Sequence, residues 1–219
     1  MPLRWIVRAV PERKPVIEYL QYHIPGLEVV WDKHRDGMET FLRAMDTAGD
    51  DPAVHLEDDC ILTKRFTQLM VNEIHKKPND IIQAFSRSKY DITDGSRYRG
   101  GGHFSCTVCF YIPRGLSAEI ASFYDSPDWA ETRNIHPTGW DYMMAALFAK
   151  KRLNYWIRVP SLVDHIIQPS QIGGRSARRL STTFKSPDYR NYPHTPQEQL
   201  SDSRLPLHGV KPTRRKSEQ

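Results

Sequence analysis

The residues with the clearest chemical potential are three consecutive acids, Glu57, Asp58 and Asp59, which follow the apolar run 53–56. At a separation of ~4 Å and an effective dielectric constant of about 20, each pair of like charges repels by about 4 kcal/mol. Solvent or a cation must relieve this repulsion. Mg²⁺ or Mn²⁺ would do so, since both suit carboxylate sites that also hold a diphosphate. The alternative is an exposed acidic turn, with Asp59 close to the N-terminus of a helix that Thr63 caps.

The three cysteines, Cys60, Cys106 and Cys109, offer weaker chemistry. Their odd number cannot be fully paired within the chain, which favours a reducing compartment. Cys106 and Cys109 have the spacing of a redox or zinc motif, but they fall in 104–112, an apolar run typical of one strand. Residues three apart in a strand face opposite sides, and no second cysteine pair completes a zinc site. We therefore expect buried strand cysteines.

Apolar strands alternate with amphipathic helices around the acidic triplet. The expected elements are strands at 5–10, 27–31 and 53–56 and helices at 12–22, 38–45 and 63–75. This alternation predicts an α/β domain with a mostly parallel central sheet flanked by helices. Ligands bind at the carboxyl ends of the strands in such sheets. Charged clusters fall at the ends of all three strands, at 8–13, 32–33 and 57–59.

The second half of the chain continues this pattern around a long polar segment. The expected elements are strands at 80–85, 104–112, 155–159 and 162–167 and helices at 116–124 and 139–151. Residues 86–102 are polar and rich in glycine, which indicates a long loop. We predict one domain over residues 1–184 and a basic tail, rich in Ser and Pro and partly disordered, over residues 185–219.

Charge is distributed unevenly along the 219 residues. From residue 173 onward the chain carries 10 Lys and Arg against 4 Asp and Glu, whereas the remainder carries 21 against 22. The basic end would meet the phosphates of a nucleotide or a nucleic acid, or else form a solvated terminus. The apolar runs 104–112 and 142–149 are too short to span a membrane, and the N-terminus lacks the apolar core of a signal peptide. A cytoplasmic protein without a membrane span is expected.

The segment 54–60, with its Leu-Glu-Asp-Asp sequence, resembles the strand-plus-acidic motif of nucleotide-sugar glycosyltransferases of the GT-A fold. The closest similarity is to the lipopolysaccharide-modifying glycosyltransferase family 25 and related small phage enzymes. Three further features follow in the order of that fold, at 99–103, 136–141 and 163–165. The resemblance covers residues 5–168 and implies a GT-A-like domain that uses a UDP-sugar donor and Mn²⁺ or Mg²⁺. The chain lacks the additional acceptor-side sequence of members that act on lipopolysaccharide, which puts that acceptor in doubt.

The resemblance also implies roles for individual residues. Asp59 would ligate the metal that bridges the donor phosphates, with His165 as the second protein ligand. Glu57 or Asp58 would face the ribose or a metal-bound water, and Asp141 would be the base at the acceptor hydroxyl in an inverting displacement. A retaining mechanism is the alternative, since retaining enzymes of this fold can also carry an acid at this place. The residues expected to hold the nucleotide and the donor sugar are Arg8, Arg13, Asp32, Lys33, Gly101 and Gly102. Read without the resemblance, His165 is a half-buried strand histidine and Asp141 an acid in the first turn of a helix.

The basic tail and the loop bases Arg87, Lys89, Arg97 and Arg99 favour an intracellular polyanion as acceptor. Hydroxymethylated phage DNA, modified in the host cytoplasm, is the acceptor we expect, and a saccharide or a protein is the alternative. A second function open to the same residues is a metal-dependent nuclease or phosphoesterase. A non-catalytic nucleic-acid-binding module is disfavoured, because such a module normally carries its charge on the folded domain.

Overall fold

The structure, a computed structural model, describes residues 2–133, 139–165 and 180–193. The strands in these residues are β1 (Arg4–Ala9), β2 (Glu28–Trp31), β3 (Ala53–Glu57), β4 (Cys60–Leu62), β5 (Ile81–Gln83), β6 (Arg97–Gly100), β7 (Cys109–Ile112), β8 (Asn154–Ile157) and β9 (Val163–His165). The helices are α1 (Lys14–His23), α2 (Gly37–Ala48), α3 (Phe66–Lys76), α4 (Asp91–Asp94), α5 (Leu116–Phe123), α6 (Pro127–Arg133) and α7 (Trp140–Lys150). Two 3-10 helices are η1 (Pro11–Arg13) and η2 (Gly101–His103).

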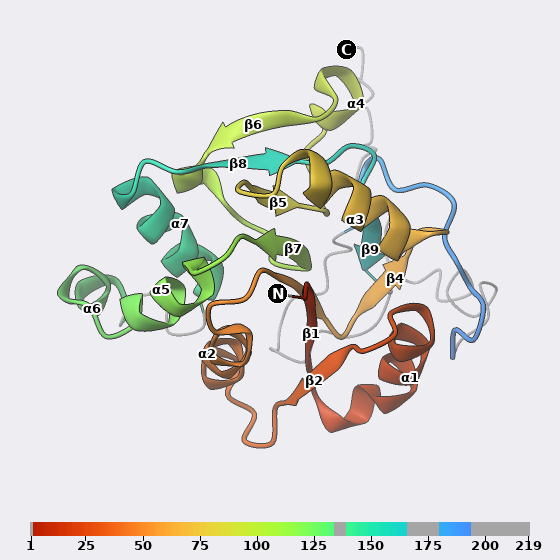
Figure 1. The fold of residues 1–219 in the computed structure, drawn as a ribbon, viewed down its shortest axis with the longest axis horizontal. Coiled ribbons are helices and arrows are strands. Elements are labelled where there is room, and N and C mark those ends of the chain that lie inside the picture. Colours follow the sequence, from red (N-terminus) through yellow and green to blue (C-terminus); the bar gives the residue numbers. More distant parts are fainter. Residues whose placement is uncertain (1, 134–138, 166–179, 194–219) are drawn as a thin grey trace, which may run out of the picture.

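Seven strands form one mixed sheet in the order β2-β1-β3-β7-β5-β8-β6, and β4 pairs with β9 in a second, smaller sheet (Figure 1). β2, β1 and β3 are parallel neighbours, as the sequence predicts. β7 lies antiparallel between β3 and β5, and β6 is antiparallel to β8 at the edge. The α/β class with flanking helices is thus confirmed, but the predicted mostly parallel sheet is wrong: the sheet is mixed, because β7 and β6 run antiparallel to their neighbours.

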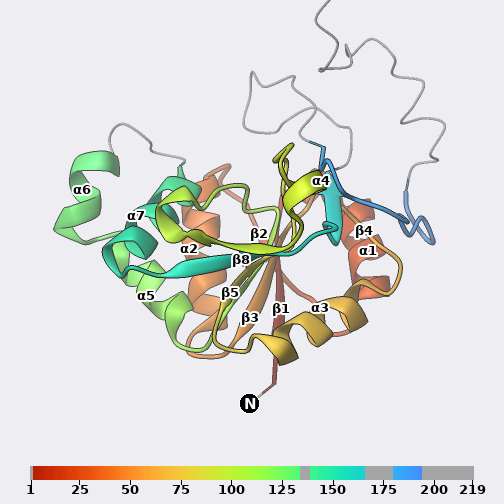
Figure 2. The ribbon, with the colours of Figure 1, turned by 90° about the horizontal axis from the view of Figure 1, so that it is seen from above.

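Helices cover both faces of the sheet (Figure 2). α1 and α3 pack on one face in the larger hydrophobic cluster, and α2, α5 and α7 pack on the other. Alternate residues of β3 enter these two cores, because successive side chains of a strand point to opposite faces. Leu56 joins the α1 and α3 side, whereas His55 stacks on Phe110 of the other side at 5.2 Å. Burial lowers the pKa of His55 to about 3, so its ring is a neutral core group.

The predicted strand 104–112 is too long, since β7 begins only at Cys109. Cys106 has a φ of 66°, in the left-handed region that non-glycine residues rarely adopt, and this turn ends any extended run before it. Cys109 is buried in a strand as predicted, but Cys106 is half-buried and lies outside a strand. The predicted loop 86–102 contains α4 and β6. None of the described helices is long and apolar enough to cross a membrane.

The segment after Phe184 packs on the domain. The Asp188 amide donates to the Leu62 carbonyl at 2.7 Å, and the Tyr19 hydroxyl donates to the Asp188 carbonyl at 2.8 Å. Packing therefore continues past the predicted boundary, at least to residue 193, and the rest of the predicted tail lies outside the described residues. Thr63 takes part in this contact and is not the predicted helix cap, because its hydroxyl donates to the Lys185 carbonyl and α3 begins later, at Phe66.

We expect a chain that ends at Phe184 to be less stable than one that ends at Pro193. The shorter chain loses the contacts of Asp188 with Leu62 and Tyr19 and that of Lys185, at about 1 kcal/mol for each hydrogen bond. Urea unfolding should show a free energy of unfolding lower by about 3 kcal/mol. Equal stability of the two truncated chains would contradict the packing described for residues 185–193.

Tyr19→Phe should destabilise the protein by about 1–3 kcal/mol, because it leaves two buried backbone groups without partners. The Tyr19 hydroxyl accepts from the Leu62 amide at 2.9 Å and donates to the Asp188 carbonyl. Tyr22→Phe is the matched control, since Tyr22 lies on the same helix and is exposed. Thermal unfolding of the two variants is the measurement, and equal melting temperatures would refute the role of the hydroxyl.

Candidate metal centre

Two strand registers assemble the site. In the large sheet, the parallel pairing of β1 and β3 places Arg8 beside Glu57 at the carboxyl ends of both strands. In the small sheet, the antiparallel pairing of β4 and β9 places His165 opposite Cys60, which directly follows Asp59. The acidic triplet bridges β3 and β4, so both registers meet at the same place.

Glu57, Asp59 and His165 form a group that suits a metal ion. Each offers one ligand atom, and these atoms lie within 4.8 Å of one another. Asp59 Oδ2 is 3.2 Å from His165 Nδ1, while Asp59 Oδ1 is buried and has no hydrogen-bond partner among the described residues. Two carboxylates and an imidazole suit Mn²⁺, with Mg²⁺ favoured less by the imidazole. The donor set therefore fits the ion that the sequence predicts, and it adds Glu57 to the two predicted ligands.

Asp58 is not part of this group. Its Oδ2 accepts a hydrogen bond from the Val10 amide at 2.7 Å, which ties the triplet to the end of β1. Burial raises the pKa of Asp58 to about 7, and the neighbouring charge of Asp59 adds to the rise. The three acids thus divide into two candidate ligands and one group that anchors the backbone.

Asp59 and His165 stabilise each other's charge. Burial opposes the ionisation of Asp59, but the charge and hydrogen bond of His165 and the charge of Arg13 outweigh it and lower the Asp59 pKa. Burial likewise opposes protonation of His165, and Asp59 outweighs it, so the His165 pKa is raised. The His165 ring also packs edge-on against Phe85 at 5.1 Å, which fixes its orientation.

Arg8 is a buried cation beside the group. Its Nη2 donates to Glu57 Oε1 and to the Thr107 carbonyl, both at 3.1 Å. The guanidinium carbon lies 5.2 Å from the ring centroids of both Phe41 and Trp140, which supply cation–π contacts. Burial lowers the pKa of Arg8, and the charge of Glu57 opposes this shift. Predicted from the sequence as a nucleotide-binding residue, Arg8 is found in contact with Glu57 of the candidate group.

Three further residues are predicted to bind the nucleotide: Arg13, Asp32 and Lys33. Arg13 is buried and close enough to lower the pKa values of Asp58 and Asp59. Asp32 follows β2, the neighbour of β1, and its carboxylate accepts from the Asp36 amide at 3.0 Å. Lys33 is exposed. These three residues follow β1 or β2 at the carboxyl end of the sheet, which is where the sequence predicts a nucleotide site.

Gly101 and Gly102 are not brought to the carboxylates. They follow β6, which is four strands away from β3 in the sheet. A Cβ at Gly101 would lie 2.4 Å from the Cβ of Phe148, so this glycine is required for close packing of η2 on α7. The tight contact explains Gly101 without a ligand, and the predicted role of both glycines in sugar binding stays a prediction.

Asp141 is the second residue of α7 and is half-buried. Its Oδ1 accepts from the Tyr142 amide at 3.1 Å. The preceding residue, Trp140, reaches the site, because its Nε1 donates to the Thr107 hydroxyl at 2.7 Å. Residues 136–138 of the predicted acceptor segment lie outside the described residues. Thr107 is the site residue that the sequence did not reveal, since it falls within the apolar run expected to be a strand.

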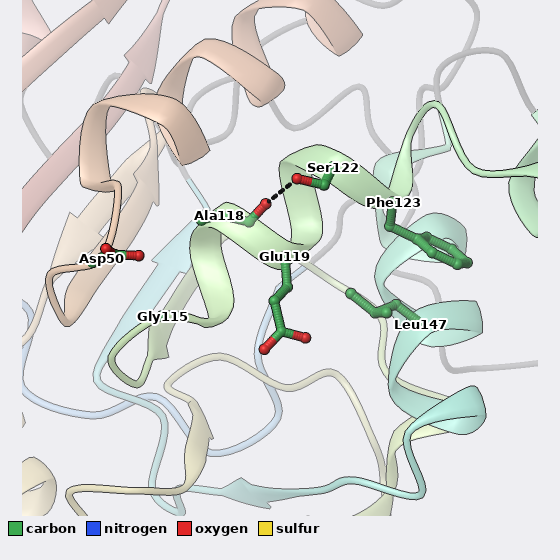
Figure 3. Close-up of a pocket in the computed structure, with 7 residues that line it drawn as sticks. All are labelled: Asp50, Gly115, Ala118, Glu119, Ser122, Phe123 and Leu147. Atoms are coloured by element: carbon green, nitrogen blue, oxygen red, sulfur yellow. Dashed lines mark hydrogen bonds between the residues drawn. The ribbon is translucent and has the colours of Figure 1, made fainter.

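A shallow hollow between α5 and α7 lies apart from this site (Figure 3). Its lining residues are Asp50, Gly115, Ala118, Glu119, Ser122, Phe123 and Leu147. The Ser122 hydroxyl donates back to the Ala118 carbonyl, and Glu119 pairs with Lys151, so these two polar groups of the hollow already have partners. None of the predicted site residues lines it.

The chain matches no model of a known protein family, and no curated protein matches it. The chemistry of the site therefore carries the functional assignment.

Asp59→Asn should abolish stabilisation of the protein by Mn²⁺, because an amide is a much weaker metal ligand than a carboxylate. In the unmodified chain, Mn²⁺ at ~100-fold excess over its Kd should stabilise the fold by about 2.7 kcal/mol. Asp58→Asn is the matched control, since its side-chain carbonyl can still accept from the Val10 amide. Thermal unfolding with Mn²⁺ and with a chelator measures both, and an undiminished Mn²⁺ effect in Asp59→Asn would rule out this site.

Proposed function

We propose that the protein is a metal-dependent glycosyltransferase with a GT-A-like fold, which transfers a sugar from a UDP-sugar to an acceptor hydroxyl. The observation that carries the proposal is the group of Glu57, Asp59 and His165 at the carboxyl ends of parallel strands, beside the buried cations Arg8 and Arg13. The Leu-Glu-Asp-Asp resemblance supports the same activity.

The charges around the group suit a diphosphate leaving group. A divalent ion held by Glu57, Asp59 and His165 would offset negative charge on the departing diphosphate. Arg8 and Arg13 add fixed positive charge from the protein, in surroundings where burial strengthens electrostatic interactions. A site with two acids and two arginines at this position therefore favours a ligand that carries both phosphate and a bound cation.

Asp141 is proposed as the base. The acceptor oxygen attacks the anomeric carbon of the donor sugar and its proton passes to the Asp141 carboxylate, while the bond from that carbon to the diphosphate oxygen breaks and the nucleoside diphosphate leaves. This in-line displacement inverts the anomeric configuration. The proposal is supported by the place of Asp141 in the first turn of α7, one residue after the Trp140 that reaches Thr107.

For the acceptor, we propose a hydroxyl-bearing base of DNA that binds on the loop between β5 and α4. Phe85, which packs on the His165 ring, leads directly into this loop. Arg87 and Lys89 are exposed on it, and Tyr90 is 59% exposed and offers a stacking surface. Basic side chains next to an exposed aromatic ring suit a strand with phosphates and bases.

The test is a thermal-unfolding screen with UDP-glucose, UDP-galactose and UDP-N-acetylglucosamine, with Mn²⁺ or a chelator, followed by incubation with hydroxymethylated DNA. We expect Mn²⁺-dependent stabilisation by UDP compounds and a mass increase of the DNA by one sugar residue of the donor supplied. Cleavage of plain DNA with Mn²⁺ alone would indicate a nuclease instead. Stabilisation by UDP-sugars with transfer only to oligosaccharides would show that the acceptor is a saccharide and not DNA.

Asp141→Asn should lower the turnover of transfer by about 10²–10⁴-fold and leave the affinity for UDP unchanged, because the amide keeps the shape and removes the basicity. Asp128→Asn is the matched control, since Asp128 is also an acid in the first turn of a helix, α6. Initial rates at saturating donor measure the effect. Turnover close to that of the unmodified chain would show that the base lies elsewhere.

A further inference from the structure

We propose that Thr107 is a positioning residue that orients Glu57 as a metal ligand and links this ligand to α7, the helix of Asp141. The inference rests on the proposed metal site. It adds residues that would not bind the metal themselves but would hold one of its ligands in place. It follows from a chain of three side chains: Trp140, Thr107 and Glu57.

The directions of the hydrogen bonds in this chain are fixed by the groups themselves. The indole Nε1 of Trp140 can only donate, and it lies 2.7 Å from the Thr107 hydroxyl oxygen. That oxygen therefore accepts from Trp140, and its single proton is directed to Glu57 Oε1 at 2.8 Å. Thr107 is buried, so bulk water does not compete for these bonds.

Arg8 is the second side chain that binds Glu57, and it reaches Glu57 from the neighbouring strand β1. Its Nη2 donates to the same Glu57 Oε1 and to the Thr107 carbonyl, each at 3.1 Å. Both hydrogen-bond donors thus bind Glu57 Oε1. Neither of them occupies Oε2, which stays available to a metal ion. Removal of the Thr107 hydroxyl would leave Arg8 alone to hold the orientation of the carboxylate.

The backbone around Thr107 is shaped for this contact. Cys106 adopts a φ of 66°, which is costly for a residue with a Cβ and persists where the surroundings determine it. The turn allows the Val108 carbonyl to accept from the Glu57 amide at 2.9 Å while the Thr107 side chain reaches the Glu57 carboxylate. Glu57 is therefore held at its main chain by Val108 and at its side chain by Thr107, two residues that are adjacent in the sequence.

Trp140 is in turn fixed from α2. A Cβ at Gly37 would lie 2.9 Å from Trp140 Cζ3, so the indole packs directly on the backbone where α2 begins. Phe41 stacks against the indole with a centroid distance of 6.0 Å and an interplanar angle of 12°. The start of α7, with Asp141 next to Trp140, is thereby positioned relative to Glu57.

The test is the dissociation constant for Mn²⁺, measured from the electron paramagnetic resonance signal of free Mn²⁺ without any nucleotide. Thr107→Val removes the hydroxyl at nearly constant volume and should weaken Mn²⁺ binding by about 10–100-fold, the range for groups that orient metal ligands. Thr107→Ser retains the hydroxyl and should restore binding. Thr47→Val is the matched control, because the Thr47 hydroxyl bonds within α2.

Trp140→Phe provides a second, independent variant, since it keeps an aromatic ring and removes the donor that fixes the Thr107 proton. It should also weaken Mn²⁺ binding, and circular dichroism confirms folding of each variant. Unchanged Mn²⁺ affinity in a folded Thr107→Val or Trp140→Phe protein overturns the inference. Absence of Mn²⁺ binding by the unmodified chain refutes the metal site itself, which is a separate result.

Discussion

The pairing of Arg8 with Glu57 across two parallel strands is the constraint on which the site depends. β1 and β3 are parallel neighbours, so the buried cation Arg8 and the partly exposed acid Glu57 lie side by side at their carboxyl ends. A buried guanidinium is costly to leave uncompensated, and the acidic triplet supplies the compensation. Arg13 and His165 add further positive charge beside the same triplet, and a divalent ion there remains our proposal.

The small sheet of β4 and β9 brings the histidine of the site to Asp59. The large sheet supplies Arg8 and Glu57, but His165 arrives from the last described strand and reaches Asp59 only through the pairing of Cys60 with His165. Both strands of the small sheet are only three residues long. Their pairing is supported by the segment after Phe184, which contacts the Leu62 end of β4.

Local patterns in the sequence were sufficient for the first three strands beside the site, but they did not predict β4, the strand that pairs with β9. Apolar runs located β1, β2 and β3, and the order of these strands made a shared edge of charged residues predictable. Three features could not be found this way, because each depends on contacts between distant residues. Gly101 is required by packing on Phe148, the Thr107 contact depends on the backbone turn at Cys106, and residues 185–193 look like a polar tail until Asp188 meets Tyr19.

Asp59 and His165 are about 100 residues apart in the sequence, yet they lie in contact. An ion bound by both would join the two ends of a very long loop in the folded domain, and it would oppose any partial opening that separates them. It would also hold together two short strands that have little pairing energy of their own. The metal would then determine the cooperativity of unfolding, with the first and last parts of the domain separating together in its presence and in succession without it.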